Sequence, residues 1–290
     1  MLRQTTANLS MAAAVLRKNE QLLRRCQSVE HACKLVPKLI VNHDNLLCVG
    51  RTTCSKPIYQ LPGLADYCWY IPSYFDDPAD VAAEILTTMV DSPPHSNSLP
   101  LSDAHSTETL WKEYQECGKS RERSRLNRLR WSCVGYHYDW GQRTYSRENV
   151  SSFPETFSKL YNTILSEIRA CTQNEAVVGT AESAIINLYH SHRPSDRLGG
   201  HRDDVELTDS TPLLSLSLGL TGIFLIESEA IVLNPGDVVV MAGTARHSLH
   251  GVPCIFAPNR KRKIMQQESE DPISDFLGKT RISVSIRQVY

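Results

Sequence analysis

The sequence predicts an α+β protein whose C-terminal half is an antiparallel sandwich or jelly roll. A strongly periodic helical segment in the middle of the chain is followed by short strand-like runs separated by turns. Asn234-Pro-Gly-Asp237, between two of these runs, is a strong turn signal. The runs are expected at residues 184–189, 213–220, 222–226, 230–233, 238–242 and 281–289.

The central helix is expected over residues 152–171. Pro154 is typical of a first helical turn, and Ser152 with Glu155 predicts a capping box. The apolar residues recur at helical spacing, which indicates a single core-facing side made of Phe157, Leu160, Tyr161, Ile164, Leu165 and Ile168.

Length and composition fit an ordinary globular chain. The 290 residues are 41% hydrophobic, which allows a normal core. Lys+Arg 31 nearly balance Asp+Glu 32, so any affinity for nucleic acid must come from local clusters of charge. The nine cysteines contain no C-x-x-C pair, which indicates reduced thiols in an intracellular protein. No apolar run approaches the roughly 20 residues of a membrane span, so no membrane contact is expected.

Residues 1–50 are predicted to form a helical extension. The first acidic residue is Glu20, and a helix here would be basic on one side and apolar on the other. Such a segment is typical of a mitochondrial transit peptide, and equally of an amphipathic helix docked on the domain. We therefore expect an intracellular protein, mitochondrial or nuclear and cytoplasmic.

The next region, 51–150, mixes several elements. Short strands broken by turns are expected between 36 and 80, and a helix over Ala79 to Met89. Residues 91–105 are rich in Ser and Pro and predict an exposed loop. Ser106 is a suitable N-cap for a helix over 108–126.

A basic cluster then runs directly into an aromatic strand. Tyr136, Tyr138 and Trp140 alternate after Trp131, which predicts one aromatic face. Basic residues beside stacked aromatics suit phosphate contacts plus base stacking, although a solvated helix face and core aromatics would give the same pattern. The basic residues are Lys119, Arg121, Arg123, Arg125, Arg128 and Arg130.

The segment between Gly251 and Lys279 is expected to be a long insertion, at 252–279, and the sequence leaves open whether it is ordered. It carries the basic run 260–263 and then becomes acidic. An insertion of this size is usually functional or disordered. The basic run could contact nucleic acid or serve as a localisation signal, or it could be a solvated loop.

The residues with the clearest chemistry are His201, Asp203 and His250. On a strand, the His201-Arg-Asp203 spacing places imidazole and carboxylate on one face. Two histidines and one carboxylate form the facial triad of non-heme Fe(II) oxygenases. Arg281 and Arg287 would likewise share a face of the last strand.

These residues occur in an ordered set that resembles the AlkB family of Fe(II)- and 2-oxoglutarate-dependent dioxygenases, and the branch containing AlkB homologue one. The resemblance implies a double-stranded β-helix core at 151–290, preceded by a nucleotide-recognition lid within 51–150. The set consists of Asn187-Leu-Tyr189, His201-Arg-Asp203, Pro235-Gly-Asp237, Arg246-His-Ser-Leu-His250-Gly251 and Arg281-x5-Arg287, with Leu129 to Trp140 and Thr211 to Gly219 upstream and between.

The resemblance also implies roles. His201, Asp203 and His250 would be the iron ligands and catalytic centre, and Arg281 would fork onto the distal carboxylate of 2-oxoglutarate. The remaining co-substrate contacts would be Arg287, Asn187 and Tyr189. Substrate contacts would come from Trp131, Tyr136, Tyr138, Asp204 and Arg246.

The activity implied is oxidative demethylation of N-methylated nucleobases, which consumes O2 and 2-oxoglutarate and releases formaldehyde, succinate and CO2. Methyladenine in tRNA is the favoured substrate. The enzyme would act on a base that has been flipped out of its stack. The protein is expected to be a monomer. The alternatives are DNA methyladenine, the same chemistry on a protein such as a histone, or a nucleic-acid-binding module without catalysis.

Two departures from the family pattern concern the pocket. Val205 stands where the bacterial pattern has an acid that helps contact the base, with Asp204 and Glu206 beside it. Ser283 and Ser285 stand where the family often has Asn and Thr. Base preference and one co-substrate hydrogen bond are therefore the features that the resemblance predicts least directly.

Overall fold

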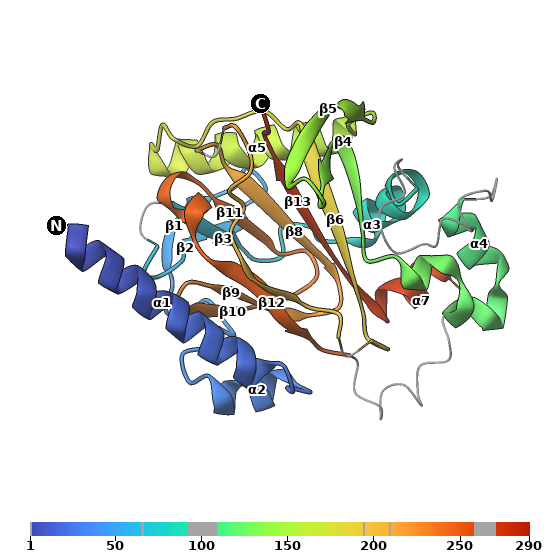
Figure 1. Cartoon of the computed structure of the whole chain (residues 1–290), viewed down its shortest axis with the longest axis horizontal. Coiled ribbons are helices and arrows are strands. Elements are labelled where there is room, and N and C mark those ends of the chain that lie inside the picture. The colour runs from blue at the N-terminus through green and yellow to red at the C-terminus, as the bar shows by residue number, and fades with distance from the viewer. Residues whose placement is uncertain (1, 65–66, 92–108, 194, 209, 258–270) are drawn as a thin grey trace.

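The computed structural model describes residues 2–64, 67–91, 109–193, 195–208, 210–257 and 271–290. Two antiparallel sheets form the centre of the molecule, and helices lie outside them (Figure 1). This arrangement confirms the α+β jelly roll that the strand pattern predicted.

The larger sheet has nine strands in the order β1-β2-β3-β11-β8-β13-β6-β4-β5. The three short strands before residue 80 belong to it and confirm the prediction made for that region. The strands are β1 (Leu47–Arg51), β2 (Pro57–Gln60), β3 (Cys68–Ile71), β4 (Trp131–Asp139), β5 (Thr144–Val150), β6 (Ser183–His190), β8 (Leu213–Gly219), β11 (Val238–Met241) and β13 (Thr280–Arg287).

The smaller sheet has four strands in the order β10-β9-β12-β7. Tyr189 and Met241 from the larger sheet share a buried cluster with Phe224 and Leu233 from the smaller one, so the two sheets enclose a common interior. The strands are β7 (Leu198–His201), β9 (Gly222–Ile226), β10 (Glu229–Leu233) and β12 (His250–Ile255).

Successive side chains of strand β13 point to opposite faces of the sheet, so alternate residues lie in the hydrophobic core and in the cavity. Ile282, Val284 and Ile286 point into the hydrophobic core under the helices. The residues between them point the other way and line the cavity between the sheets: Arg281, Ser283, Ser285 and Arg287. The predicted strand at 281–289 is therefore confirmed, with both arginines on one face.

Helix α5 (Glu155–Thr172) covers the outer face of the larger sheet and confirms the central helix. It begins at Glu155, because Pro154 occupies the N-cap with extended backbone and no side-chain cap hydrogen bond. The predicted capping box is therefore wrong. Helix α3 (Ala79–Glu84) and the π-helical turn η1 (Ile85–Met89) confirm the other helix expected on this side.

The helix predicted over 108–126 is shorter than expected. Helix α4 (Leu110–Glu116) is capped by Thr109, and Gly118, at φ +49°, ends the regular helix. Two 3₁₀ turns follow, η3 (Gly118–Arg123) and η4 (Arg125–Arg128). The predicted cap Ser106 and most of the 91–105 loop lie outside the described residues.

At the N-terminal end, α1 (Leu2–Leu23) and α2 (Val29–Leu35) pack on the outside of the smaller sheet (Figure 1). Leu16 and Leu23 are fully buried there. The amphipathic helix is therefore docked on the domain, and cleavage of a targeting segment stays a prediction. No helix in the described part of the chain is long and apolar enough to cross a membrane.

The insertion predicted at 252–279 is partly wrong. Its first residues continue strand β12, and its end forms α7 (Pro272–Leu277). The α7 helix starts because Pro272 follows Asp271, whose carboxylate accepts hydrogen bonds from the backbone of Ile273 and Ser274. The basic run at 260–263 lies outside the described residues. All nine cysteines are free thiols, in agreement with the absence of a disulfide framework.

Candidate active site

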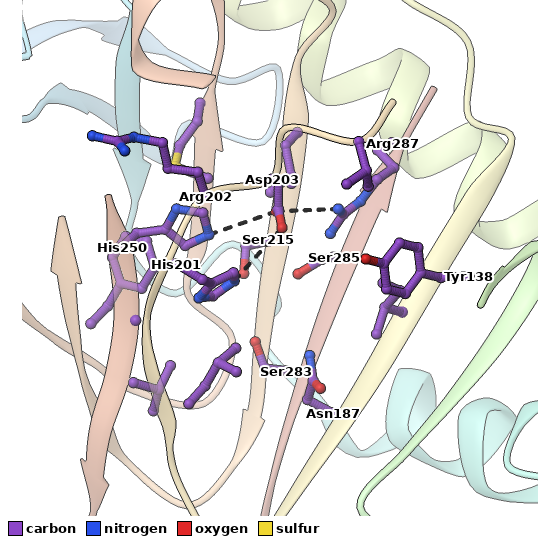
Figure 2. A pocket seen from close by; sticks show the side chains of 18 of the residues that line it. Tyr138, Asn187, His201, Arg202, Asp203, Ser215, His250, Ser283, Ser285 and Arg287 are labelled. Atoms are coloured by element: carbon purple, nitrogen blue, oxygen red, sulfur yellow. Dashed lines mark ion pairs between the residues drawn. The ribbon is translucent and has the colours of Figure 1, made fainter. Parts of the chain in front are cut away.

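A cavity of about 290 Å³ lies between the two sheets and is lined by residues from both. Its polar side chains come from strands that are distant in sequence, and they converge in Figure 2. Phe224, Leu233 and Met241 supply apolar wall. A partly apolar cavity with a few converging polar groups is the usual form of a small-molecule site.

His201, Asp203 and His250 meet at one end of this cavity. Each offers one ligand atom, and these atoms all lie within 4.8 Å of one another. Each histidine Nε2 lies 3.6 Å from a different oxygen of Asp203. Among the described residues this is the cluster with metal-ligating geometry.

The two histidines are positioned by direct strand pairing, because His201 on β7 is the register partner of His250 on β12. Asp203 lies two residues beyond the end of β7, so the prediction that one strand carries both ligands is wrong. The loop is instead held in place by Arg202, whose Nε donates to the His247 carbonyl at 2.7 Å.

Both imidazoles are oriented by backbone carbonyls. His201 Nδ1 lies 3.0 Å from the Gly199 carbonyl, and His250 Nδ1 lies 3.0 Å from the Ser248 carbonyl. A hydrogen bond donated from Nδ1 leaves the Nε2 lone pair for a metal. Burial, with the neighbouring His250, lowers the pKa of His201, which favours the neutral ring that metal binding requires.

Arg287 holds the carboxylate of this cluster in its charged form. Its Nη1 lies 3.2 Å from Asp203 Oδ2, and both side chains are largely buried. Burial alone would raise the pKa of Asp203, but Arg287 and His250 outweigh it and hold the pKa well below its ordinary value. In return, Asp203 keeps the pKa of Arg287 well above its ordinary value despite burial.

Glu206 completes this buried charge network and was not assigned a role from the sequence. Its carboxylate lies 2.7 Å from Arg287 and 3.4 Å from Arg246. The hydroxyl of Tyr145 on β5 also donates to it at 3.3 Å. The sequence indicates only that an acid stands near Asp203. Its position cannot show that side chains from other elements, such as Arg287 and Tyr145, contact Glu206.

The prediction that Arg246 contacts substrate is wrong. The side chain is fully buried, and it donates to the carbonyls of Thr211 at 2.9 Å and Asp203 at 3.4 Å. It does not line the cavity. Arg246 therefore braces the loop that carries Asp203, from the side away from the ligand space.

Arg281 is the strongest candidate for binding an anion in the cavity. It is 1% exposed, and no carboxylate lies within ion-pair distance in the described part of the chain. It donates to the carbonyls of Leu220 and Leu233 and to Ser217, while its Nε has no partner there. Burial lowers its pKa to about 10, as expected for a buried cation without a counter-charge.

The neighbours of Arg281 extend this polar surface. Tyr189 is its register partner on β6, and Asn187 faces Ser283 in the same way. Both line the cavity. Figure 2 shows Asn187 on the same wall as Ser283 and Ser285. The structure therefore brings together Asn187, Tyr189, Arg281 and Arg287, the four residues predicted to contact the co-substrate.

The aromatic strand is divided by a bulge. The pairing of β4 with β5 shifts register between Tyr136 and Tyr138, so these two tyrosines do not follow the alternation of a regular strand. Tyr138 and Trp140 line the cavity. Tyr136 instead packs against Tyr290, with ring centroids 4.8 Å apart, so its predicted place in the cavity is wrong.

The mouth of the cavity carries charged residues. Asp204 lines it, as do Val205 and the arginines 143 and 202. Arg143 lies 4.0 Å from Asp204, and both side chains are at least half exposed, so the pair is solvated. Neither arginine was singled out from the sequence, because isolated arginines in loops carry no pattern.

Comparison with protein families agrees with this geometry. The profile of the 2OG-Fe(II) oxygenase superfamily matches residues 85–287, which is more than half of the chain. The chain belongs to this superfamily. Its members use Fe(II), O2 and 2-oxoglutarate, and the matched region contains every residue of the cluster and of the Arg281 wall.

Several relatives of known name are similar over this region. The chain is 32% identical over 208 residues to the DNA N(6)-methyladenine demethylase ALKBH1A of Arabidopsis thaliana, covering 63% of this chain and 58% of the relative. It is 30% identical over 217 residues to the human nucleic acid dioxygenase ALKBH1, covering 63% and 53%. It is 32% identical over 170 residues to the tRNA demethylase abh1 of Schizosaccharomyces pombe, covering 56% and 53%. The chain thus spans about half the length of these curated relatives.

The residues fit the groups that the superfamily uses. His201, Asp203 and His250 would hold Fe(II) through two neutral imidazoles and one ionised carboxylate, which is the donor set this metal takes in such oxygenases. When bound, Fe(II) supplies the activation of O2 at the expense of 2-oxoglutarate. Arg281, with its unpartnered Nε, fits the distal carboxylate of that co-substrate.

The remaining chemistry belongs to the protein. Arg287 keeps Asp203 ionised, and the backbone carbonyls keep each Nε2 directed at the metal position. The apolar wall around Phe224 and Met241 limits water near the reacting atoms. Tyr138 and Trp140 line one side of the cavity with aromatic rings, along which a substrate can reach the cluster.

Proposed function

We propose that the protein removes methyl groups from N-methylated nucleobases, with methyladenine in tRNA as the favoured substrate. One observation carries the proposal: a single cavity contains the His-Asp-His cluster, the unpaired Arg281, and Tyr138 with Trp140 at the approach. Flat aromatic rings beside an oxidising centre suit a flat base that has left its stack.

The reaction inserts one atom of O2 into a C–H bond of the N-methyl group. The other oxygen atom enters 2-oxoglutarate, which loses CO2 and becomes succinate. The resulting N-hydroxymethyl group loses formaldehyde, and the nitrogen recovers a proton. The cavity wall orients both organic partners, so that the methyl group lies toward the cluster while Arg281 holds the co-substrate.

The names of the relatives support this choice of substrate class. They are described as acting on tRNA, on DNA methyladenine or on nucleic acid in general. One of the basic residues that lead into β4 also lies beside the cavity. Arg130, the last of them, borders the hollow beside the cavity that Trp131 also lines.

The proposal is tested with tRNA that carries methylated adenine, incubated with Fe(II), 2-oxoglutarate and O2. The wild-type protein should release formaldehyde and succinate in equal amounts. His201→Ala should release neither, because it removes a ligand of the cluster. His247→Ala is the matched control, since this exposed histidine lies close in sequence to His250 but outside the cluster.

Two results would contradict the proposal. Equal formaldehyde release by wild type and His201→Ala would separate the activity from this site. Succinate formation without formaldehyde on methylated RNA and DNA, but with formaldehyde on a methylated histone peptide, would keep the chemistry and move the substrate to protein.

A further inference from the structure

A second hollow adjoins the cavity and has no role in the chemistry described above. Its volume is about 310 Å³. It shares four residues with the cavity, namely Trp140, Asn187, Tyr189 and Leu198, so the two spaces are contiguous. Its remaining walls are Arg130, Trp131, Leu188 and Arg197.

Two tryptophans give this hollow an aromatic surface. The rings of Trp131 and Trp140 are 5.5 Å apart between centroids and tilted by 53°. Trp131 is nearly buried, at 9% exposed, whereas Trp140 is 50% exposed and is one of the few large apolar side chains open to solvent. Trp140 also contacts Tyr138 in the cavity, edge to face at 4.7 Å. An exposed ring between two hollows can stack with a flat group in either.

Two arginines give the hollow positive charge. Arg197 is partly buried, and it makes no hydrogen bond or ion pair with the described residues. Arg130 lies 3.6 Å from Asp196, but that carboxylate is itself buried and accepts from the His190 backbone. The charge of Arg197 is therefore left for an external anion.

We propose that this hollow is a subsite for the nucleotide next to the target base. The neighbouring base stacks on Trp140, and the phosphate that joins it to the target nucleotide contacts Arg197, with Arg130 behind it. Both charge and shape favour this occupant, because a nucleotide combines a flat ring with an anionic group. The inference rests on the proposed function and specifies that the protein binds at least one nucleotide beside the target base.

The subsite predicts that substrate length matters. A methylated nucleoside fills the cavity alone, whereas a trinucleotide with the methylated base in the centre also fills the hollow. Wild type should therefore process the trinucleotide with a kcat/KM on the order of tenfold higher than the nucleoside. Arg197→Gln should remove most of this advantage and leave the nucleoside unaffected.

The variant is suited to the test because Arg197 lines the hollow and not the cavity, and it has no partner to lose among the described residues. Arg169→Gln is the charge-matched control, since Arg169 is exposed on α5, which packs against the opposite face of the larger sheet. A second readout is binding of an unmethylated trinucleotide, followed by tryptophan fluorescence. Arg197→Gln should weaken binding and reduce its salt dependence by about one phosphate contact.

The outcomes are distinguishable. If wild type releases formaldehyde from neither substrate, the proposed function fails. If it processes both but Arg197→Gln keeps the full preference for the trinucleotide, the subsite is wrong and the function stands. If Arg197→Gln reduces turnover of a methylated peptide and not of the trinucleotide, the hollow binds protein and the inference is overturned.

Discussion

The guanidinium of Arg287 lies 3.2 Å from the carboxylate of Asp203, inside a buried network that also contains Glu206. Arg287 thus pairs with two acids, of which Asp203 belongs to the His-Asp-His cluster and Glu206 also lies near a second cation, Arg246. The pair ties the last strand of the larger sheet to the loop that follows β7. Loss of either partner should therefore affect both stability and the cluster.

Replacing Arg287 tests this link. Arg287→Gln leaves Asp203 and Glu206 buried near each other without their main counter-charge, and should lower the free energy of unfolding by about 3 kcal/mol. Denaturant unfolding of the metal-free protein measures the loss. Lys159→Gln is the control, because its ion pair with Glu155 is exposed to solvent and should contribute almost nothing to the free energy of unfolding. Equal small effects in both variants would show that the buried network adds little.

Co-substrate affinity should depend on Arg281. Arg281→Gln removes a buried positive charge, and should raise the dissociation constant of 2-oxoglutarate by roughly 30-fold, about 2 kcal/mol. Arg281→Lys should restore little, because an ammonium cannot fork onto a carboxylate. Calorimetric titration with Mn(II) present measures this affinity without turnover. If Arg281→Gln binds 2-oxoglutarate with unchanged affinity, the distal carboxylate of the co-substrate does not bind to Arg281.

Gly222 offers an indirect route to the same arginine. A Cβ at this position would lie 3.1 Å from both Cδ and Nε of Arg281, so Gly222→Ala should displace the guanidinium. We expect weaker 2-oxoglutarate binding with Mn(II) affinity unchanged, since Gly222 does not touch the cluster. A parallel loss of Mn(II) affinity would indicate general distortion of β9.

The two tyrosines of β4 should behave differently. Tyr138 lines the cavity, so Tyr138→Ala should reduce kcat/KM on methylated RNA by about tenfold while leaving the melting temperature nearly unchanged. Tyr136→Ala loses the packing against Tyr290, so it should lower the melting temperature and affect the RNA reaction less. If Tyr136→Ala reduced kcat/KM on methylated RNA more than Tyr138→Ala did, the assignment of Tyr138 to the cavity and of Tyr136 to the packing against Tyr290 would be wrong.

Acid should destabilise the protein through His190. The ring is fully buried between the Leu129 carbonyl and Thr280, and burial lowers its pKa to about 4. The unfolded chain therefore binds this proton first, so the stabilising effect is complete above pH ~6.5 and declines as pH falls toward 4. Between pH 7 and pH 5 the loss should be about 2 kcal/mol, and His190→Gln should abolish that part of the pH dependence. An unchanged pH dependence in the variant would exclude His190 as the cause.

Alternation along strands made part of this site predictable. Arg281 and Arg287 were expected on one face, and they line one cavity because their spacing is even and β13 has no bulge. The pattern of short apolar runs, each bounded by turn residues, also predicted the jelly roll. Local periodicity is enough wherever a strand stays regular.

Irregular backbone and long-range contacts were not predictable in the same way. The pairing of β4 with β5 shifts register between Tyr136 and Tyr138, and only Tyr138 of the two lines the cavity. Asp203 lies outside β7 and reaches the histidines through a loop held by Arg202 and Arg246. Glu206 gains its partners from strands far away in the sequence. These features depend on tertiary packing, which a single sequence does not encode in any local pattern.

The most direct test of the account is a crystal structure with Mn(II) in place of the reactive metal and 2-oxoglutarate bound. It should show the metal bonded to Nε2 of His201, Nε2 of His250 and the carboxylate of Asp203, with the distal carboxylate of 2-oxoglutarate on Arg281. A metal bound elsewhere, or a co-substrate whose distal carboxylate lies on Arg143 or Arg202 at the mouth, would contradict it.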